Sequence, residues 1–153
     1  NGGGHNMAAG FTLNRDSLRA FKNYILEDFV KSNTVTDNIF FYESEISSLA
    51  FNQDFYDDLK KLEPFGTGNP VPTFLLRDLK IIKSTILNNK HVSLRLKSKT
   101  GFSIKSISFN SINTKVGEYL MNYKNNIDVI GQINENIWNN KKSNQLTIKD
   151  LIL

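Results

Sequence analysis

The segment Leu62–Pro72, LEPFGTGNPVP, constrains the fold more than any other part of the chain. It contains all three prolines and two of the nine glycines of this 153-residue sequence. Proline lacks a backbone N–H and fixes φ, and glycine tolerates φ values that other residues avoid, so neither a helix nor a central strand continues through it. The segment predicts a rigid joint at residues 63–72, between one part at 1–62 and another at 73–153.

The charge of the chain changes across this joint. Residues 1–72 carry six lysines and arginines against ten aspartates and glutamates, whereas residues 73–153 carry thirteen against five. A basic second part favours a polyanionic partner such as nucleic acid. The alternative is a solvated basic surface without a ligand.

The composition bounds the class of protein. Cysteine is absent, which excludes disulfides and cysteine-ligated zinc. No apolar run approaches the roughly 18 residues of a membrane span, and the first residues lack a signal-peptide pattern, so we expect a soluble, cytoplasmic protein. The carboxylate pairs Asp57–Asp58 and Glu43/Glu45 are interpreted as solvated charges, and we predict no metal site. Because the chain starts without Met, inside a glycine run, we expect a fragment of a longer protein.

The residues before the joint predict two helices and a strand. Asn14 suits an N-cap, and a stripe of apolar residues at helical spacing predicts a helix that ends at Ser32. The run 38–43, NIFFYE, is aromatic and β-branched and predicts a strand. Asn52 suits the N-cap of a second helix, which ends before Pro64. Its apolar positions are Phe51, Phe55, Leu59 and Leu62.

The residues after the joint predict five strands and one helix. Strands are expected at 74–82, 90–99 and 102–109, with a bulge near Lys105 or Ser106 where the apolar alternation shifts phase. A helix with Val116, Tyr119, Leu120 and Tyr123 on its buried stripe follows, and then a hairpin of strands 127–137 and 145–153. This order matches the five-stranded Greek-key barrel called the OB-fold, so the predicted class is α+β.

Ligands of OB-folds bind across the second and third strands and the loops that join strands one to two and four to five. Here these regions are 90–109, 83–89 and 139–144. Most of the basic residues of the second part lie in them: Lys83, Lys90, Arg95, Lys97, Lys99, Lys105, Lys141 and Lys142. Phe102 and Trp138 are candidates for stacking on bases, although aromatic residues of a small barrel often fill its core, which is the favoured interpretation for Phe102. His91 is expected on the exposed side beside the basic residues.

Two strings resemble one family. GGGHNMAAGF at residues 2–11 resembles the glycine-histidine motif of the DHH-associated domain of DHH phosphoesterases, and LEPFGTGNPVPTF at 62–74 resembles the LEPFGxGNPEPxF signature of the RecJ exonucleases. Val71 stands where that family usually has Glu. The resemblance implies that residues 1–62 are the end of a DHH-associated domain and that residues 73–153 are the OB-fold domain.

The resemblance also implies a function. RecJ enzymes digest single-stranded DNA in the 5′ to 3′ direction during repair and recombination, with Mn²⁺ or Mg²⁺ held by a DHH domain. No Asp-His-His string occurs in this chain, so it is expected to be inactive alone and to bind and guide single-stranded DNA. Gly2, Gly3, Gly4 and His5 would hold a substrate phosphate, and single-stranded-DNA-binding protein or a helicase is a possible partner. A protein-docking OB module and an RNA-directed DHH nuclease remain alternatives, since RNA binding relies on the same physics.

Overall fold

The computed structural model describes residues 2–5, 8–32 and 39–152, without the side chain of Trp138. The chain divides into two compact units, Asn1–Ile39 and Phe40–Leu153. The joint therefore lies within the second unit, although the sequence places a domain boundary there. The assignment of residues 1–62 to a DHH-associated domain stays a prediction.

The first unit contains a hairpin and a helix. β1, Gly2–His5, pairs antiparallel with β2, Ala8–Phe11, and a short 3₁₀ turn, η1, Arg15–Ser17, leads into α1, Leu18–Lys31. Asn14 precedes η1 but accepts no capping hydrogen bond. The apolar side chains of α1 are largely exposed, and Phe21 packs against Phe11 of the hairpin with 4.6 Å between the ring centroids.

The strand predicted at 38–43 is wrong. Residues 39–43 form no regular element, and residue 38 lies outside the described part of the chain. The strand of this region is β3, Ser44–Glu45, which pairs in parallel with the first residues of β4, Phe74–Leu87. Aromatic and β-branched residues form a strand only where a neighbouring strand offers backbone partners, and that edge begins beside Ser44.

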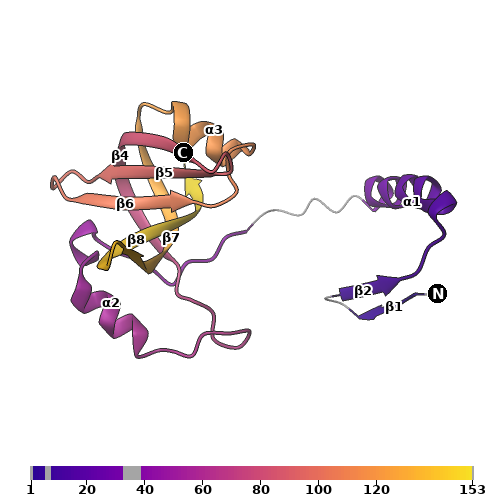
Figure 1. Ribbon diagram of the computed structural model, residues 1–153, viewed down its shortest axis with the longest axis horizontal. Helices are drawn as coiled ribbons and strands as arrows, with labels where there is room; N and C mark the ends of the chain where they lie inside the picture. The colour runs from indigo at the N-terminus through magenta and orange to yellow at the C-terminus, as the bar shows by residue number, and fades with distance from the viewer. Residues whose placement is uncertain (1, 6–7, 33–38, 153) are drawn as a thin grey trace. The chain divides into compact units, whose positions relative to one another are not determined.

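The second unit is a closed five-stranded barrel (Figure 1). Its strand order is β4-β5-β6-β8-β7, with β7 pairing back to β4. Among these five strands only β6 and β8 pair in parallel, as in an OB-fold, so the predicted α+β class and barrel are confirmed. The remaining elements are β5, His91–Lys97; β6, Ser103–Ser108; α3, Lys115–Asn122; β7, Asn126–Trp138; and β8, Lys141–Ile152.

Two of the barrel's hairpins close through Asn-Asn turns rather than the longer loops expected. Asn88 and Asn89 have φ values of 50° and 53°, and Asn139 and Asn140 have 47° and 59°. Asparagine tolerates this left-handed region, which turns of type I′ require at both central positions. Residues 88–90 separate the partners Leu87 and His91, and only residues 139 and 140 separate the partners at positions 138 and 141. β4 therefore reaches Leu87 and β8 begins at Lys141, so the expected loops 83–89 and 139–144 are wrong in their bounds.

The bulge expected in β6 is also absent. β6 pairs with β5 in unbroken register from Val92↔Ser108 to Lys97↔Ser103. The apolar phase shift has another cause: the alternation continues, and the small residue Ser106 takes an inward position in the core without any exposed surface. The bulges lie in β4, between Leu76 and Leu79 and between Ile81 and Lys83.

Two helices cover the barrel, and Figure 1 shows α3 at one end of it and α2, Gln53–Lys60, at the other. The side chain of Asn52 accepts the N–H of Phe55 at 2.9 Å, which confirms the predicted N-cap. Phe51 is buried in the core, and the ring of Phe55 lies 5.6 Å from that of Phe74. At α3, Ser84 Oγ donates to the carbonyl of Leu120 at 2.6 Å.

The joint forms a closed turn beside the barrel. The backbones of Gly66 and Asn69 exchange hydrogen bonds of 2.8 and 3.1 Å. The side chain of Asn69 donates to the carbonyls of Leu62 and Pro64, at 2.7 and 3.1 Å. Gln132 of β7 donates to the carbonyl of Val71 at 3.1 Å, which ties the end of the joint to the barrel.

Candidate nucleic-acid interface

Three cationic side chains lie opposite one another on adjacent strands of the barrel. Lys83 of β4 is the register partner of Arg95 of β5, and Arg95 is the partner of Lys105 of β6. We call these three residues the basic row. Lys80 and Lys97 form a second pair of partners on the same side of β4 and β5. The five residues together are the basic face.

The sequence of β5 explains why the cations point outward. Val92, Leu94 and Leu96 are buried and alternate with exposed Arg95 and Lys97, so one side of the strand joins the core and the other faces solvent.

A bulge in β4 brings the third cation into the basic row. Ile81 is opposite Leu96 and Lys83 is opposite Arg95, so Ile82 is an extra residue without a partner. In a regular strand Ile82 itself would oppose Arg95, and Lys83 would lie on the inward side. The bulge therefore places a cation where an isoleucine would otherwise stand.

None of the five residues of the basic face has a carboxylate partner among the described residues. Lys105 Nζ lies 3.4 Å from a hydroxyl oxygen, Ser143 Oγ. Like charges placed directly opposite each other destabilise a sheet. The basic face thus carries an electrostatic cost that a bound polyanion would remove.

Two of the predicted cations are already paired. Lys142 Nζ lies 3.1 Å from Glu135 Oε2, and Lys99 forms an ion pair with Asp78. Hydrogen bonds from Lys99 and then from Asn126 lower the pKa of Asp78, and the bond to Asp78 raises the pKa of Lys99. These two lysines are less available to phosphates than the basic face.

The Lys99–Asp78 pair belongs to a network at one edge of the barrel. Arg77 Nε donates to Glu45 Oε2 at 2.7 Å, and Arg77 Nη1 donates to Asp128 Oδ2 at 2.8 Å. The other oxygen of Asp128 accepts the backbone N–H of Asp78 at 2.8 Å. The network joins β3, β4 and β7, so these charges hold strands together rather than face a ligand.

An aromatic group lies on the same outward side, beyond the basic row. Leu87 of β4 is opposite His91 of β5, and the ring of His91 meets the ring of Phe109 edge-on, with centroids 5.2 Å apart. We call Leu87, His91 and Phe109 the aromatic step. His91 precedes Arg95 by four residues, which is about 13 Å along a strand. His91 thus lies on the side where the sequence predicts it.

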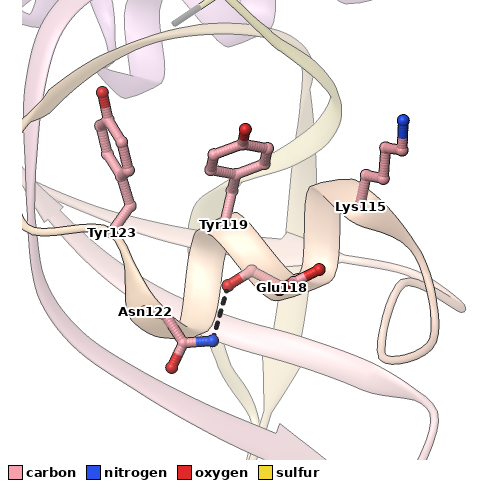
Figure 2. A pocket seen from close by; sticks show the side chains of 5 residues that line it. All are labelled: Lys115, Glu118, Tyr119, Asn122 and Tyr123. Atoms are coloured by element: carbon pink, nitrogen blue, oxygen red, sulfur yellow. Dashed lines mark hydrogen bonds between the residues drawn. The ribbon is translucent and has the colours of Figure 1, made fainter.

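Tyr119 of α3 and Tyr123, which follows its last residue, form a second aromatic pair. The sequence predicts both on the buried stripe of the helix, but Tyr119 is 41% exposed, whereas Tyr123 is partly buried against the core. Tyr119 and Tyr123 lie one turn apart, with ring centroids separated by 5.7 Å. Figure 2 shows both rings on one side of the helix, with Lys115 at the far end. They line a shallow pocket of about 370 Å³ that also contains Glu118 and Asn122. A carboxylate in the lining makes this pocket less suited to phosphate than the basic face.

The family model described as the RecJ OB domain matches residues 42–150. The chain belongs to the RecJ OB domain family. The match includes β3, α2 and the joint as well as the barrel, in agreement with the extent of the second compact unit.

One curated relative and two solved structures are similar to the chain. The chain is 28% identical over 154 residues to the single-stranded-DNA-specific exonuclease RecJ of Bacillus subtilis strain 168, covering 97% of this chain and 19% of that protein. Crystal structures of Thermus thermophilus RecJ in complex with Mn²⁺ and with Mg²⁺ match with TM-scores of 0.69 and 0.66, at 23% and 24% identity. These alignments cover 100% and 99% of this chain and 22% of each RecJ chain, and they show the shared fold. The chain spans about a fifth of the length of these relatives.

Within the RecJ OB domain, the structure brings some predicted binding residues together and separates others. Lys83, Arg95, Lys97 and Lys105 share the basic face, whereas Lys90 and Lys141 lie beside the two Asn-Asn turns. Phe102 is partly buried against the core, as favoured from the sequence. The side chain of Trp138 lies outside the described part of the structure, so its stacking role stays a prediction.

Sequence reasoning misses Lys80 and Phe109. Lys80 cannot be found from the pattern because the pairing Lys80↔Lys97 depends on the register of β4 and β5, which the Asn-Asn turn and the bulge at Ile82 set together. The alternation places Phe109 on the apolar side of a strand, but it follows the end of β6 and is 54% exposed.

The glycine-histidine string forms a strand rather than a loop. Gly2, Gly3, Gly4 and His5 make up β1, and all four are exposed. A Cβ on Gly4 would lie 2.8 Å from that of Ala9, so the hairpin itself requires this glycine. A Cβ on Gly3 would meet nothing within 4 Å, so hairpin packing does not explain that glycine. The phosphate-binding role of this string stays a prediction.

The described residues contain no group of three or more His, Asp or Glu side chains arranged to hold a metal ion. The two Thermus RecJ structures are complexes with Mn²⁺ and with Mg²⁺, and we assign no ligand of either ion to this chain. No helix in the described ranges is long and apolar enough to cross a membrane.

Proposed function

We propose that this chain is part of a single-stranded-DNA-specific 5′ to 3′ exonuclease, in which the barrel binds single-stranded DNA and guides it to a catalytic DHH domain outside this sequence. The observation that supports the proposal is the basic face, with five cations in register and no carboxylate partner among the described residues. Membership of the RecJ OB domain family and the name of the Bacillus relative agree with it.

The proposed interaction is made with phosphates. Lysine and arginine contacts to phosphates are independent of sequence and sensitive to salt, which suits a nuclease that digests any sequence. The basic face crosses β4, β5 and β6, and in OB-folds the ligand lies over the second and third strands, here β5 and β6. Lys90 and Lys141, beside the turns, would extend the path at its ends.

The test is a titration of the 153-residue chain with fluorescently labelled single-stranded DNA, single-stranded RNA and duplex DNA of equal length. We expect binding that weakens steeply with salt and that favours single-stranded DNA over the duplex. An absence of binding to any nucleic acid at low salt would contradict the proposal and favour a protein-docking role. Preference for RNA would support the RNA-directed alternative.

A second assay tests the division of labour. The chain is incubated with Mn²⁺ and an end-labelled single strand, and we expect no shortening of the strand. Digestion by this chain would show that the catalytic groups lie within residues 1–153 and would contradict the assignment of catalysis to another domain.

A further inference from the structure

The barrel contains three phenylalanines, and they differ in burial. Phe74 is buried and Phe102 is partly buried, whereas Phe109 is 54% exposed. Its exposed ring lies just beyond the end of β6, on the outward side that also carries the basic row. Burying a phenylalanine stabilises a fold, so packing within the chain does not account for this position.

The surroundings of Phe109 hold its ring in place. The imidazole of His91 meets the ring edge-on at an interplanar angle of 77°. The backbone N–H of Asn110 donates to His91 Nδ1 at 2.9 Å, which fixes the orientation of the imidazole. Asn110 itself has a φ of 52°, in the left-handed region. The aromatic step is therefore preorganised, which lowers the entropy lost when a ligand binds.

The backbone of a lysine is held beside the aromatic step. Lys90 directly precedes His91, and its carbonyl accepts the N–H of Ile112 at 3.3 Å, which ties the turn of β4 and β5 to the segment after Phe109. The side chain of Lys90 is exposed. One end of the path thus combines an exposed aromatic ring with a positive charge, which are the two groups that an unpaired nucleotide contacts.

We propose that Phe109, braced by His91, stacks on an unpaired nucleobase at the end of the path that the basic face defines. This inference rests on the proposed binding of single-stranded DNA and adds a base contact to it. The basic row lies about 13 Å from the step along β5, which corresponds to about four nucleotides of a stacked strand. A single strand can therefore place phosphates on the row and a base on Phe109 together.

The occupant is assigned to a base because of the neighbouring charge. An acidic protein segment would also neutralise the basic face. A single-stranded nucleic acid fits better, because it carries both phosphates for the unpaired cations and flat bases for the exposed ring. Duplex DNA does not fit the step, because its bases are stacked on one another and offer no free face.

The test compares Phe109→Leu with the unsubstituted chain in binding to labelled oligothymidine of about 15 nucleotides. Leucine keeps an apolar side chain at the site and removes the aromatic face. We expect a loss of affinity of about 5- to 140-fold with an unchanged salt slope. Phe109→Trp keeps a stacking ring and is expected to retain the affinity. Tyr119→Leu is the matched control, since Tyr119 is also exposed and belongs to an edge-on pair.

A second ligand separates base contacts from backbone contacts. On an abasic oligonucleotide of the same length, the unsubstituted chain and Phe109→Leu are expected to bind equally. Equal binding of both proteins to oligothymidine, or an equal loss on the abasic strand, would overturn the inference while leaving the proposed function intact. If the unsubstituted chain binds neither strand at any salt concentration, the proposed function fails, and this inference fails with it.

Discussion

Removing the basic row should lower the salt dependence of single-strand binding by a calculable amount. The perturbation is the triple substitution Lys83→Gln, Arg95→Gln and Lys105→Gln. These three side chains are register partners across β4, β5 and β6, and none has a carboxylate partner among the described residues. Each phosphate neutralised on a single strand contributes about 0.7 to the slope of log K against log salt.

The magnitude follows from the number of contacts. If each of the five residues of the basic face neutralises one phosphate, the slope is about −3.5, and affinity falls about 100-fold between about 50 and 200 mM salt. The triple variant retains Lys80 and Lys97, so its slope is about −1.4 and the same change in salt weakens binding only about 7-fold. The predicted difference in slope, about 2 units, exceeds the error of an anisotropy titration.

The assay is fluorescence anisotropy of a labelled single strand at four or more salt concentrations. The control is Lys60→Gln, Lys61→Gln and Lys115→Gln, which removes the same net charge from residues on or beside α2 and α3. We expect the control to keep the slope of the unsubstituted chain. A slope that changes by less than about 0.5 in the basic-row variant, or equally in both variants, would refute the proposed path.

Further predictions concern the ion pairs and the packing. Asp78→Asn leaves Lys99 without its partner and should steepen the salt slope by about 0.7, as measured by the same titration, whereas an unchanged slope would place Lys99 off the path. Because the pKa of Asp78 is lowered, its ionised carboxylate stabilises the fold above the ordinary pKa of about 3.9, and this contribution is lost as the pH falls through the lower folded value. In Asp78→Asn, the melting temperature should therefore fall less steeply as the pH is lowered. An equally steep fall in both proteins would contradict the pairing. A Cβ on Gly117 would lie 1.8 Å from the carbonyl oxygen of Ser111, so Gly117→Ala should destabilise the chain by at least about 1–3 kcal/mol in urea unfolding, while Gly68→Ala, with nothing within 4 Å, should have little effect. Arg95→Gln relieves the repulsion within the basic row and should raise the melting temperature at low salt, and a lowered temperature would show that the row does not destabilise the sheet.

Much of the fold follows from local sequence patterns. The alternation Val92, Leu94 and Leu96 predicts which side of β5 enters the core, and Asn52 predicts the start of α2. These signals are reliable because they depend on neighbours in sequence. The barrel follows from the order of elements, which the Greek-key topology restricts.

The errors concern residues whose structure depends on distant partners. The run 39–43 has strand-forming residues but no neighbouring strand, and Ser106 resembles a break in alternation because a small polar residue stands in the core. The Asn-Asn turns resemble parts of longer loops, although two consecutive asparagines suit a left-handed turn. Lys80 and Phe109 cannot be assigned to the interface without the strand register, which for Lys80 includes the bulge at Ile82 and for Phe109 is the pairing of β5 with β6.

The net charge of residues 73–153 overstates the number of cations available to a ligand, because the barrel uses its cations in two ways. Arg77, Lys99 and Lys142 each meet a carboxylate. The pairs of Arg77 and Lys99 join parts of the chain that are distant in sequence, whereas the pair of Lys142 and Glu135 lies within the hairpin of β7 and β8. The basic face has no such partner among the described residues, and the bulge at Ile82 brings a third cation into register instead of separating like charges. The unpaired cations of the basic face cost stability in the free protein, and a bound polyanion would remove that cost. The lack of carboxylate partners, rather than the net charge, therefore favours the basic face as the surface that binds the single strand.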